Sequence, residues 1–89
     1  MENKVLVKFY SLELGLSYDV FIPVNELIWK IKKLIVKSIA DLNNMPDLYK
    51  DDYLLINKLT GKIYQNNEIV INTDIRNGTE LMLINKNFI

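Results

Sequence analysis

Histidine and cysteine are both absent from this chain of 89 residues, and glycine, proline and tryptophan are scarce. Without cysteine, the chain forms neither a disulfide nor a thiolate metal site. Without histidine, it lacks the side chain that titrates near neutral pH, so acid–base catalysis would depend on carboxylates. The densest acidic group (Asp47, Asp51 and Asp52) falls in a polar segment and lacks the regular spacing of a calcium loop. We therefore predict no enzyme, no metal site and no cofactor.

A surplus of charge and a long apolar run are absent as well. Eleven basic and eleven acidic residues cancel, so the chain lacks the field that draws proteins to nucleic acid, and no nucleic-acid partner is expected. No apolar run approaches the roughly 20 residues of a membrane span. The N-terminus runs straight into a strand pattern rather than into a signal peptide. These absences predict one cytoplasmic domain over residues 1–89.

The spacing of the apolar residues predicts one helix between two sheet-forming regions. From Asn25 to Leu42 apolar residues recur every three or four positions, with Asn25 as the expected N-cap. On both sides the spacing falls to two, which predicts strands over residues 4–10, 17–22, 53–58, 62–64 and 79–84. A single helix laid across one mixed sheet is the simplest way for so short a chain to bury these faces. The predicted class is therefore α+β, with four to five strands and one packed helix.

The order strand, strand, helix, strand, short strand, strand suits the β-grasp fold. Two segments resemble ubiquitin-like proteins: the turn at Gly61-Lys62 before a short strand, and the closing segment from Ile75 to Leu83, in which a turn precedes alternating leucines. The resemblance implies that the first and last strands lie side by side and parallel at the centre of the sheet.

Among ubiquitin-like proteins, the chain most resembles the YukD and EsaB family of bacterial type VII (WXG100) secretion systems. The resemblance is carried by Tyr18-Asp19-Val20, by Ile22-Pro23 before the helix, and by Ile75, Asn77-Gly78 and Leu81 near the end. It implies a cytoplasmic accessory or regulator of secretion, with components of the secretion machinery as partners. Ubiquitin-type modifiers and sulfur carriers need a terminal diglycine, whereas this sequence ends Asn85-Lys86-Asn87-Phe88-Ile89. We therefore expect neither conjugation nor sulfur transfer.

The outer face of the sheet is the first candidate interaction surface. One set of alternating residues is predicted to face the helix: Val5, Val7, Phe9, Leu54, Ile56, Leu81 and Leu83. The pleat then turns the other set outward: Leu6, Tyr10, Tyr53, Leu55, Met82 and Ile84. An exposed apolar patch usually marks a contact surface, and ubiquitin-like folds commonly dock partners on this face. The alternative is that the tail (Phe88 and Ile89) or a second copy covers it.

The helix carries the second candidate. Its apolar face is predicted to comprise Leu27, Ile28, Ile31, Leu34, Ile35, Ile39 and Leu42. Trp29 and Val36, one heptad apart, are predicted to lie opposite and to anchor an interface, unless the indole folds onto residues 43–52. Lys30, Lys33 and Lys37 line one flank and would meet an acidic partner or anionic lipid, or simply form a solvated face. The alternative to a partner-binding module is a homodimer that assembles through Trp29–Val36 or the sheet.

Overall fold

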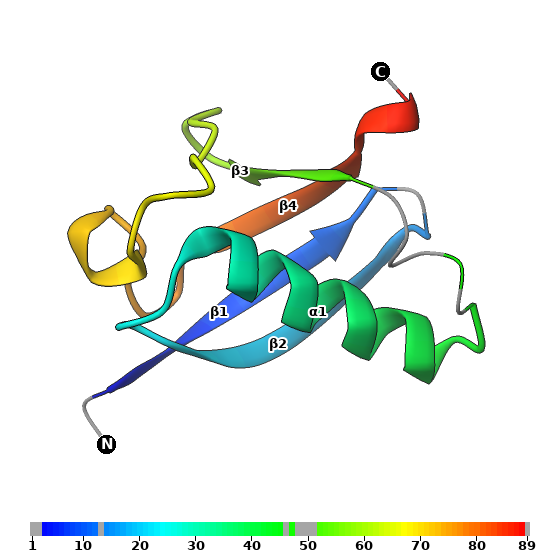
Figure 1. The fold of residues 1–89 in the computed structure, drawn as a ribbon, viewed down its shortest axis with the longest axis horizontal. Helices are drawn as coiled ribbons and strands as arrows, with labels where there is room; N and C mark the ends of the chain where they lie inside the picture. The colour runs from blue at the N-terminus through cyan, green and yellow to red at the C-terminus, as the bar shows by residue number, and fades with distance from the viewer. Residues whose placement is uncertain (1–2, 13, 46, 48–51, 89) are drawn as a thin grey trace.

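One helix lies across one face of a four-stranded sheet (Figure 1). The computed structural model describes residues 3–12, 14–45, 47 and 52–88, apart from the side chain of Phe88. Its strands and helix are β1 (Lys4–Ser11), β2 (Leu16–Pro23), α1 (Ile28–Leu42), β3 (Tyr53–Asn57) and β4 (Glu80–Asn85). Two short 3₁₀ helices follow β3 and β4, η2 (Val70–Asn72) and η3 (Lys86–Phe88).

The strand order across the sheet is β2-β1-β4-β3. β1 pairs with β2 and β4 pairs with β3 in antiparallel fashion, whereas β1 and β4 run parallel, with Phe9 opposite Leu81. The first and last strands therefore lie side by side at the centre, which confirms the predicted β-grasp order. The expected short strand over residues 62–64 is reduced to a single bridge between Ile56 and Ile63.

The core lies between α1 and the inner face of the sheet. Fully buried side chains come from every strand and from the helix, among them Phe9, Ile22, Ile31, Leu55 and Leu81. The connection between β3 and β4 closes one end of this core with Tyr64, Val70 and Ile75. Within this connection, η2 turns Val70 inward and leaves the neighbouring Ile71 52% exposed.

The helix begins two residues later than predicted, and Asn25 does not cap it. Leu27 takes the N-cap position without a side-chain cap. The amides of the first turn are satisfied by the neighbouring loop, because Ile28 N–H donates to the Glu68 carbonyl at 2.9 Å and Trp29 N–H donates to that of Asn66 at 3.3 Å. Val70 N–H in turn donates to the Glu26 carbonyl at 3.1 Å. The residues just before α1 therefore form backbone hydrogen bonds with the loop after β3 instead of extending the helix.

The buried face of α1 is rotated from the predicted one. Val36, predicted to be an exposed anchor, is 5% exposed in the core, whereas Leu34 and Leu42 are 52% and 71% exposed. Leu34 and Val36 are two residues apart, which separates them by about 160° around a helix, so they cannot both face the sheet. Ile28, Ile31, Ile35 and Ile39 are buried, and apolar residues lie on both sides of them around the helix. Packing against the sheet buries the side that carries Val36 and Ala40.

The side-chain alternation of β3 is the reverse of the predicted one. Tyr53 and Leu55, predicted to point outward, are 7% and 0% exposed, while Leu54 and Ile56 are half-buried on the outer face. All residues from 53 to 56 are apolar, so the sequence does not show which of them face the core and which face outward. The register decides it, because Leu55 pairs with Leu83, whose side chain is buried in the core. The same alternation turns the polar side chain of Asn57 towards the core, where it is 7% exposed.

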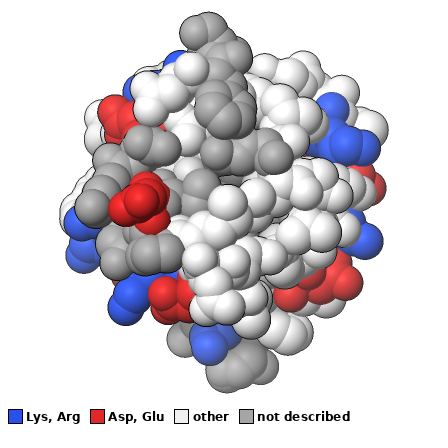
Figure 2. All heavy atoms as spheres, turned by 90° about the vertical axis from the view of Figure 1, so that its right-hand side faces the viewer, with Lys and Arg blue, Asp and Glu red and all other residues white. Residues whose placement is uncertain are grey.

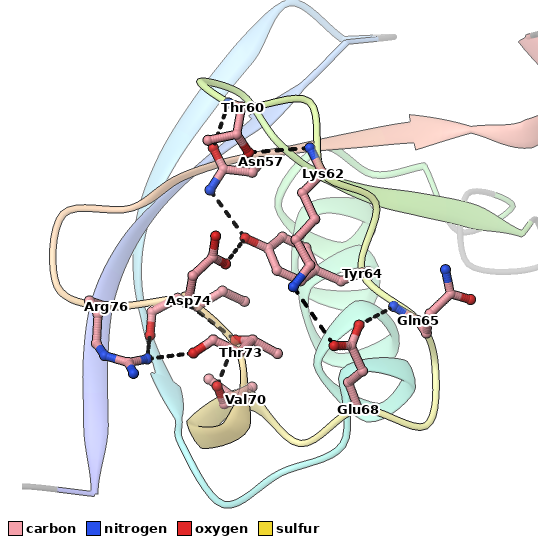
Figure 3. A network of polar contacts seen from close by, with 11 residues as sticks. Asn57, Thr60, Lys62, Tyr64, Gln65, Glu68, Val70, Thr73, Asp74 and Arg76 are labelled. Carbon is pink, nitrogen blue, oxygen red and sulfur yellow. Dashed lines mark hydrogen bonds and ion pairs between the residues drawn. The ribbon is translucent and has the colours of Figure 1, made fainter.

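A polar network satisfies Asn57 and fixes the connection to β4 (Figure 3). Asn57 Oδ1 accepts from the amides of Leu59 and Thr60, and its Nδ2 donates to the Tyr64 hydroxyl at 3.1 Å. The Tyr64 hydroxyl donates to Asp74 at 2.5 Å. The network ties the turn after β3 to the segment that leads into β4.

The rotation of α1 predicts opposite outcomes for two alanine substitutions. Val36→Ala removes two buried methyl groups and is expected to lower the free energy of unfolding by about 2 kcal/mol. Leu34→Ala removes a larger but exposed side chain and should change it by no more than about 0.5 kcal/mol. Urea unfolding of both variants measures the difference, and a larger loss in Leu34→Ala would contradict the observed rotation.

The network predicts that Tyr64→Phe lowers the free energy of unfolding by about 1–2 kcal/mol, because a buried amide donor of Asn57 loses its acceptor. Tyr10→Phe is the control, since its 3.3 Å hydrogen bond to Glu80 lies on the partly exposed sheet face.

Tyr64→Phe should also change how the free energy of unfolding depends on pH at alkaline pH. Burial and the hydrogen bond to Asp74 raise the pKa of Tyr64 from 10.0 to about 12. A pKa raised in the folded state stabilises the fold fully below the unfolded value and ceases to do so as pH rises through the folded value. Between pH 10 and 12 the native chain should therefore lose stability more steeply than Tyr64→Phe. Parallel profiles in urea unfolding would contradict the assignment.

Candidate protein-interaction surfaces

Cross-strand pairing divides the outer face of the sheet into rows. One row runs across β2, β1 and β4 as Asp19, Lys8 and Glu80, and ends at Lys58, the residue that follows β3. The charges alternate along the row, with 3.7 Å between Lys8 and Asp19 and 3.8 Å between Lys58 and Glu80. Such exposed pairs contribute little stability. Their effect here is to separate the apolar side chains on either side.

A small apolar pair lies on one side of the charged row. Leu6 and Phe21 are directly opposite each other on β1 and β2, and are 39% and 63% exposed. The prediction that Leu6 points outward agrees with this placement. Its inclusion in one continuous patch with Tyr10 and Met82 was wrong, because the charged row lies between them.

A larger apolar surface, the sheet patch, lies on the other side of the row. Met82 is its centre, flanked by Tyr10 on β1 and Ile56 on β3, and Ile84 is opposite Leu54. Ile63 joins through its bridge to Ile56, and Leu12 through the turn after β1. The sheet patch thus comprises Tyr10, Leu12, Leu54, Ile56, Ile63, Met82 and Ile84.

A shallow hollow of about 310 Å³ borders the sheet patch. It lies between the β1–β2 turn and the side chains of Tyr10, Lys58 and Met82. The Lys58 ammonium is 4.6 Å from the Tyr10 ring centroid, a cation–π contact, and the Tyr10 hydroxyl donates to Glu80. Tyr10 therefore contacts both Lys58 and Glu80 where the hollow meets the charged row.

The predicted residues and the sheet patch overlap in part. Tyr10, Met82 and Ile84 belong to it, whereas Tyr53 and Leu55 lie in the core. Four members were missed: Leu12, Leu54, Ile56 and Ile63. Ile63 and Leu12 are 46% and 58% exposed. In the sequence, the only sign of them was that each is an apolar residue close to a turn. Ile89 and the side chain of Phe88, the suggested cover, lie outside the described residues.

The solvent side of α1 carries a second surface. Trp29, Lys30, Lys33, Leu34 and Lys37, the helix stripe, line a hollow of about 430 Å³. Trp29 is 40% exposed, as predicted. Its expected companion Val36 faces the core.

Figure 2 views the molecule from the right-hand side of Figure 1, where uncharged residues fill the centre of the described surface and charged residues lie towards its edges.

Lys32 is distinct from the lysines of the helix stripe. Its ammonium donates to the Tyr53 carbonyl at 2.8 Å and so connects α1 to the start of β3. Burial lowers the pKa of Lys32, and the nearby charge of Lys86 lowers it further. Lys32 is therefore part of the packing, not of an interaction surface.

Two other kinds of functional feature are absent from the part of the chain that the structure describes. No group of three or more His, Cys, Asp or Glu within residues 3–12, 14–45, 47 and 52–88 is arranged to hold a metal ion. In the same ranges, no helix has the length and apolar character needed to span a membrane.

Solved structures show what the topology resembles. The N-terminal ubiquitin-like domain of the 4931431F19Rik protein is 18% identical, with 97% of this chain and 78% of that chain covered and a TM-score of 0.70. The ubiquitin-like domain of Arabidopsis thaliana At2g32350 is 16% identical, with coverages of 94% and 79% and a TM-score of 0.66. The chain has a ubiquitin-like β-grasp fold.

The same fold also matches a chain of the toluene 4-monooxygenase HD complex with 4-bromobenzoate. That match is 6% identical, covers 93% of this chain and 99% of that chain, and has a TM-score of 0.76. No protein-family model and no curated protein sequence matches the chain. At these identities the likeness concerns the fold alone.

The phase of β3 predicts opposite outcomes for two neighbouring glutamate substitutions. Leu55→Glu places a carboxylate in the core and should lower the free energy of unfolding by at least about 4 kcal/mol. Ile56→Glu places it on the outer face, where we expect a loss of about 1 kcal/mol or less. Urea unfolding followed by circular dichroism distinguishes them. Equal losses would mean that β3 has no single buried face.

Proposed function

We propose that this chain is a non-enzymatic protein-interaction module that binds a protein partner through the sheet patch. The supporting observation is that seven apolar side chains gather on one side of the charged row, beside the hollow at the β1–β2 turn. Contiguous exposed apolar surface on a small domain usually marks a contact site. Five of its seven members lie on β1, β3 and β4, whose backbones are fixed by strand pairing, so a partner would bind a largely preorganised surface.

The charged row gives this surface a boundary. Interfaces commonly combine an apolar centre with a polar rim that sets orientation. Here Met82 lies within the apolar part, while Lys58 and Glu80 lie along one edge. The fold is shared with ubiquitin-like domains and with a chain of a monooxygenase complex, so it occurs both as a domain and within a larger assembly.

We further propose that the partner belongs to a type VII (WXG100) secretion system, in which the chain acts as a cytoplasmic accessory or regulator. This proposal is supported by the resemblance of Tyr18-Asp19-Val20, Ile22-Pro23 and the segment from Ile75 to Leu81 to the YukD and EsaB family. In the structure, Ile22 and Leu81 belong to the core and Asp19 to the charged row. The resemblance thus concerns both the packing and the outer face.

The double variant Ile56→Glu/Met82→Glu tests the binding surface. It places two carboxylates in the sheet patch and should abolish capture of secretion components from the native host's lysate. It should also lower export of WXG100 proteins when it replaces the native chain. Phe21→Glu, on the other side of the charged row, is the matched control and should retain both. Unchanged capture by the double variant would contradict the proposed surface, and unchanged export alone would contradict the role in secretion.

A homodimer is the alternative use of the same patch. Two copies that pair their sheet patches would cover the apolar side chains without any other partner. Light scattering at micromolar concentration separates the two cases, because only the alternative gives a dimer in the isolated protein. Ile56→Glu/Met82→Glu would then convert that dimer to a monomer.

A further inference from the structure

The helix stripe lies on the side of the molecule opposite the sheet patch, since α1 packs against the inner face of the sheet (Figure 1). Its five members form one continuous arc of the helix surface at about 100° per residue: Trp29, Lys33, Lys37, Lys30 and Leu34. The aromatic ring is at one border of the arc and the leucine at the other. Three lysines lie between them.

Trp29 lies at this border, in the first turn of α1. Its backbone amide donates to the Asn66 carbonyl, which fixes the start of α1 against the loop after β3. The Lys30 ammonium is 5.5 Å from the ring centroid, within cation–π range. Trp29 remains 40% and Leu34 52% exposed. The hollow of about 430 Å³ is therefore bordered by these two apolar side chains, and Lys30, Lys33 and Lys37 complete its lining.

The positive charge of the helix stripe is poorly compensated. Lys30 lies 3.6 Å from Glu26. Lys33 and Lys37 have no ion pair with any residue in the described part of the chain. The two are four residues apart, so like charges lie next to each other on a helix, an arrangement that lowers helix stability slightly. An anionic ligand that spans both ammonium groups would relieve this repulsion.

We propose that the helix stripe binds an acidic peptide segment that carries one apolar side chain. The apolar side chain would occupy the hollow between Trp29 and Leu34, and carboxylates on either side of it would pair with Lys33 and Lys37. The stripe from residue 29 to residue 37 rises about 12 Å. An extended segment of about four residues covers that length. The chain would then bind two partners, or two parts of one partner, on opposite faces.

A peptide suits this surface better than a lipid bilayer does. The hollow is concave, and a side chain fills a concavity that a planar array of headgroups leaves open. The inference is independent of the proposed function, because it uses none of the residues of the sheet patch.

Trp29 is the sole tryptophan of the chain, so its fluorescence reports the site directly. The probe is the peptide acetyl-Glu-Asp-Glu-Leu-Glu-Asp-Glu-amide, titrated at low ionic strength. The expected result is a saturable blue shift of the emission that weakens severalfold between about 50 and 200 mM salt. The control peptide has Gln and Asn in place of Glu and Asp and should give no shift.

Matched variants assign the response to the helix stripe. Lys33→Glu should weaken binding roughly tenfold or more. Lys4→Glu makes the same change of charge at an exposed lysine of β1 and should stay within about twofold. Leu34→Ala should also weaken binding. Ile56→Glu/Met82→Glu should bind the peptide normally, so that failure of this inference and failure of the proposed function remain distinguishable.

The outcomes divide cleanly. A charge-dependent shift that Lys33→Glu weakens and Lys4→Glu does not supports the proposal, whether or not vesicles also bind. No shift with the acidic peptide overturns it, as does an equal shift with the amide peptide or equal weakening by Lys4→Glu. Vesicles of phosphatidylcholine and phosphatidylglycerol form the remaining arm. A shift with these vesicles and none with the peptide overturns the proposal in favour of a membrane surface.

Discussion

The parallel pairing of β1 with β4 is the contact on which this structure depends. It joins the two ends of the chain at the centre of the sheet, with Phe9 opposite Leu81, both fully buried beneath α1. The turn before β4 is bound to β1 as well, since Gly78 N–H donates to the Leu6 carbonyl at 2.8 Å and Leu6 N–H donates to Asn77 Oδ1 at 2.8 Å. Without this pairing, β1–β2 and β3–β4 would be two separate ribbons, and isolated two-stranded ribbons are marginal in water.

The same pairing creates both faces of the sheet. Because side chains alternate along each strand, aligning Phe9 with Leu81 on the inner face aligns Tyr10 with Met82 on the outer one. The register likewise places Lys8 beside Glu80, which continues the charged row and gives the sheet patch its edge. The outer surface is thus a geometric consequence of how the core is built. A partner that binds this surface therefore depends on the register in which β1 and β4 pair.

The connection between β3 and β4 plays a corresponding part for the helix. The network of Asn57, Tyr64 and Asp74 fixes this connection, and its carbonyls at Asn66 and Glu68 accept from the first amides of α1. The backbone of this segment, rather than a capping side chain, therefore sets where the helix begins and where Trp29 stands. The helix stripe and the sheet patch are built on opposite sides of one core, and neither requires the core to rearrange.

Periodicity and turn residues in the sequence determined the order of elements, the single helix and the central pair of strands. They also marked the outward positions of Tyr10 and Met82, because β1 and β4 alternate clearly enough to fix their phase. They did not fix the phase of β3, where four successive apolar residues fit either face, nor the rotation of α1, where Leu34 and Val36 are equally apolar. Those choices placed Leu55 and Val36 in the core and Ile56 and Leu34 at the surface. Only the tertiary structure decided them, since a local pattern records which residues avoid water but not which neighbours will cover them.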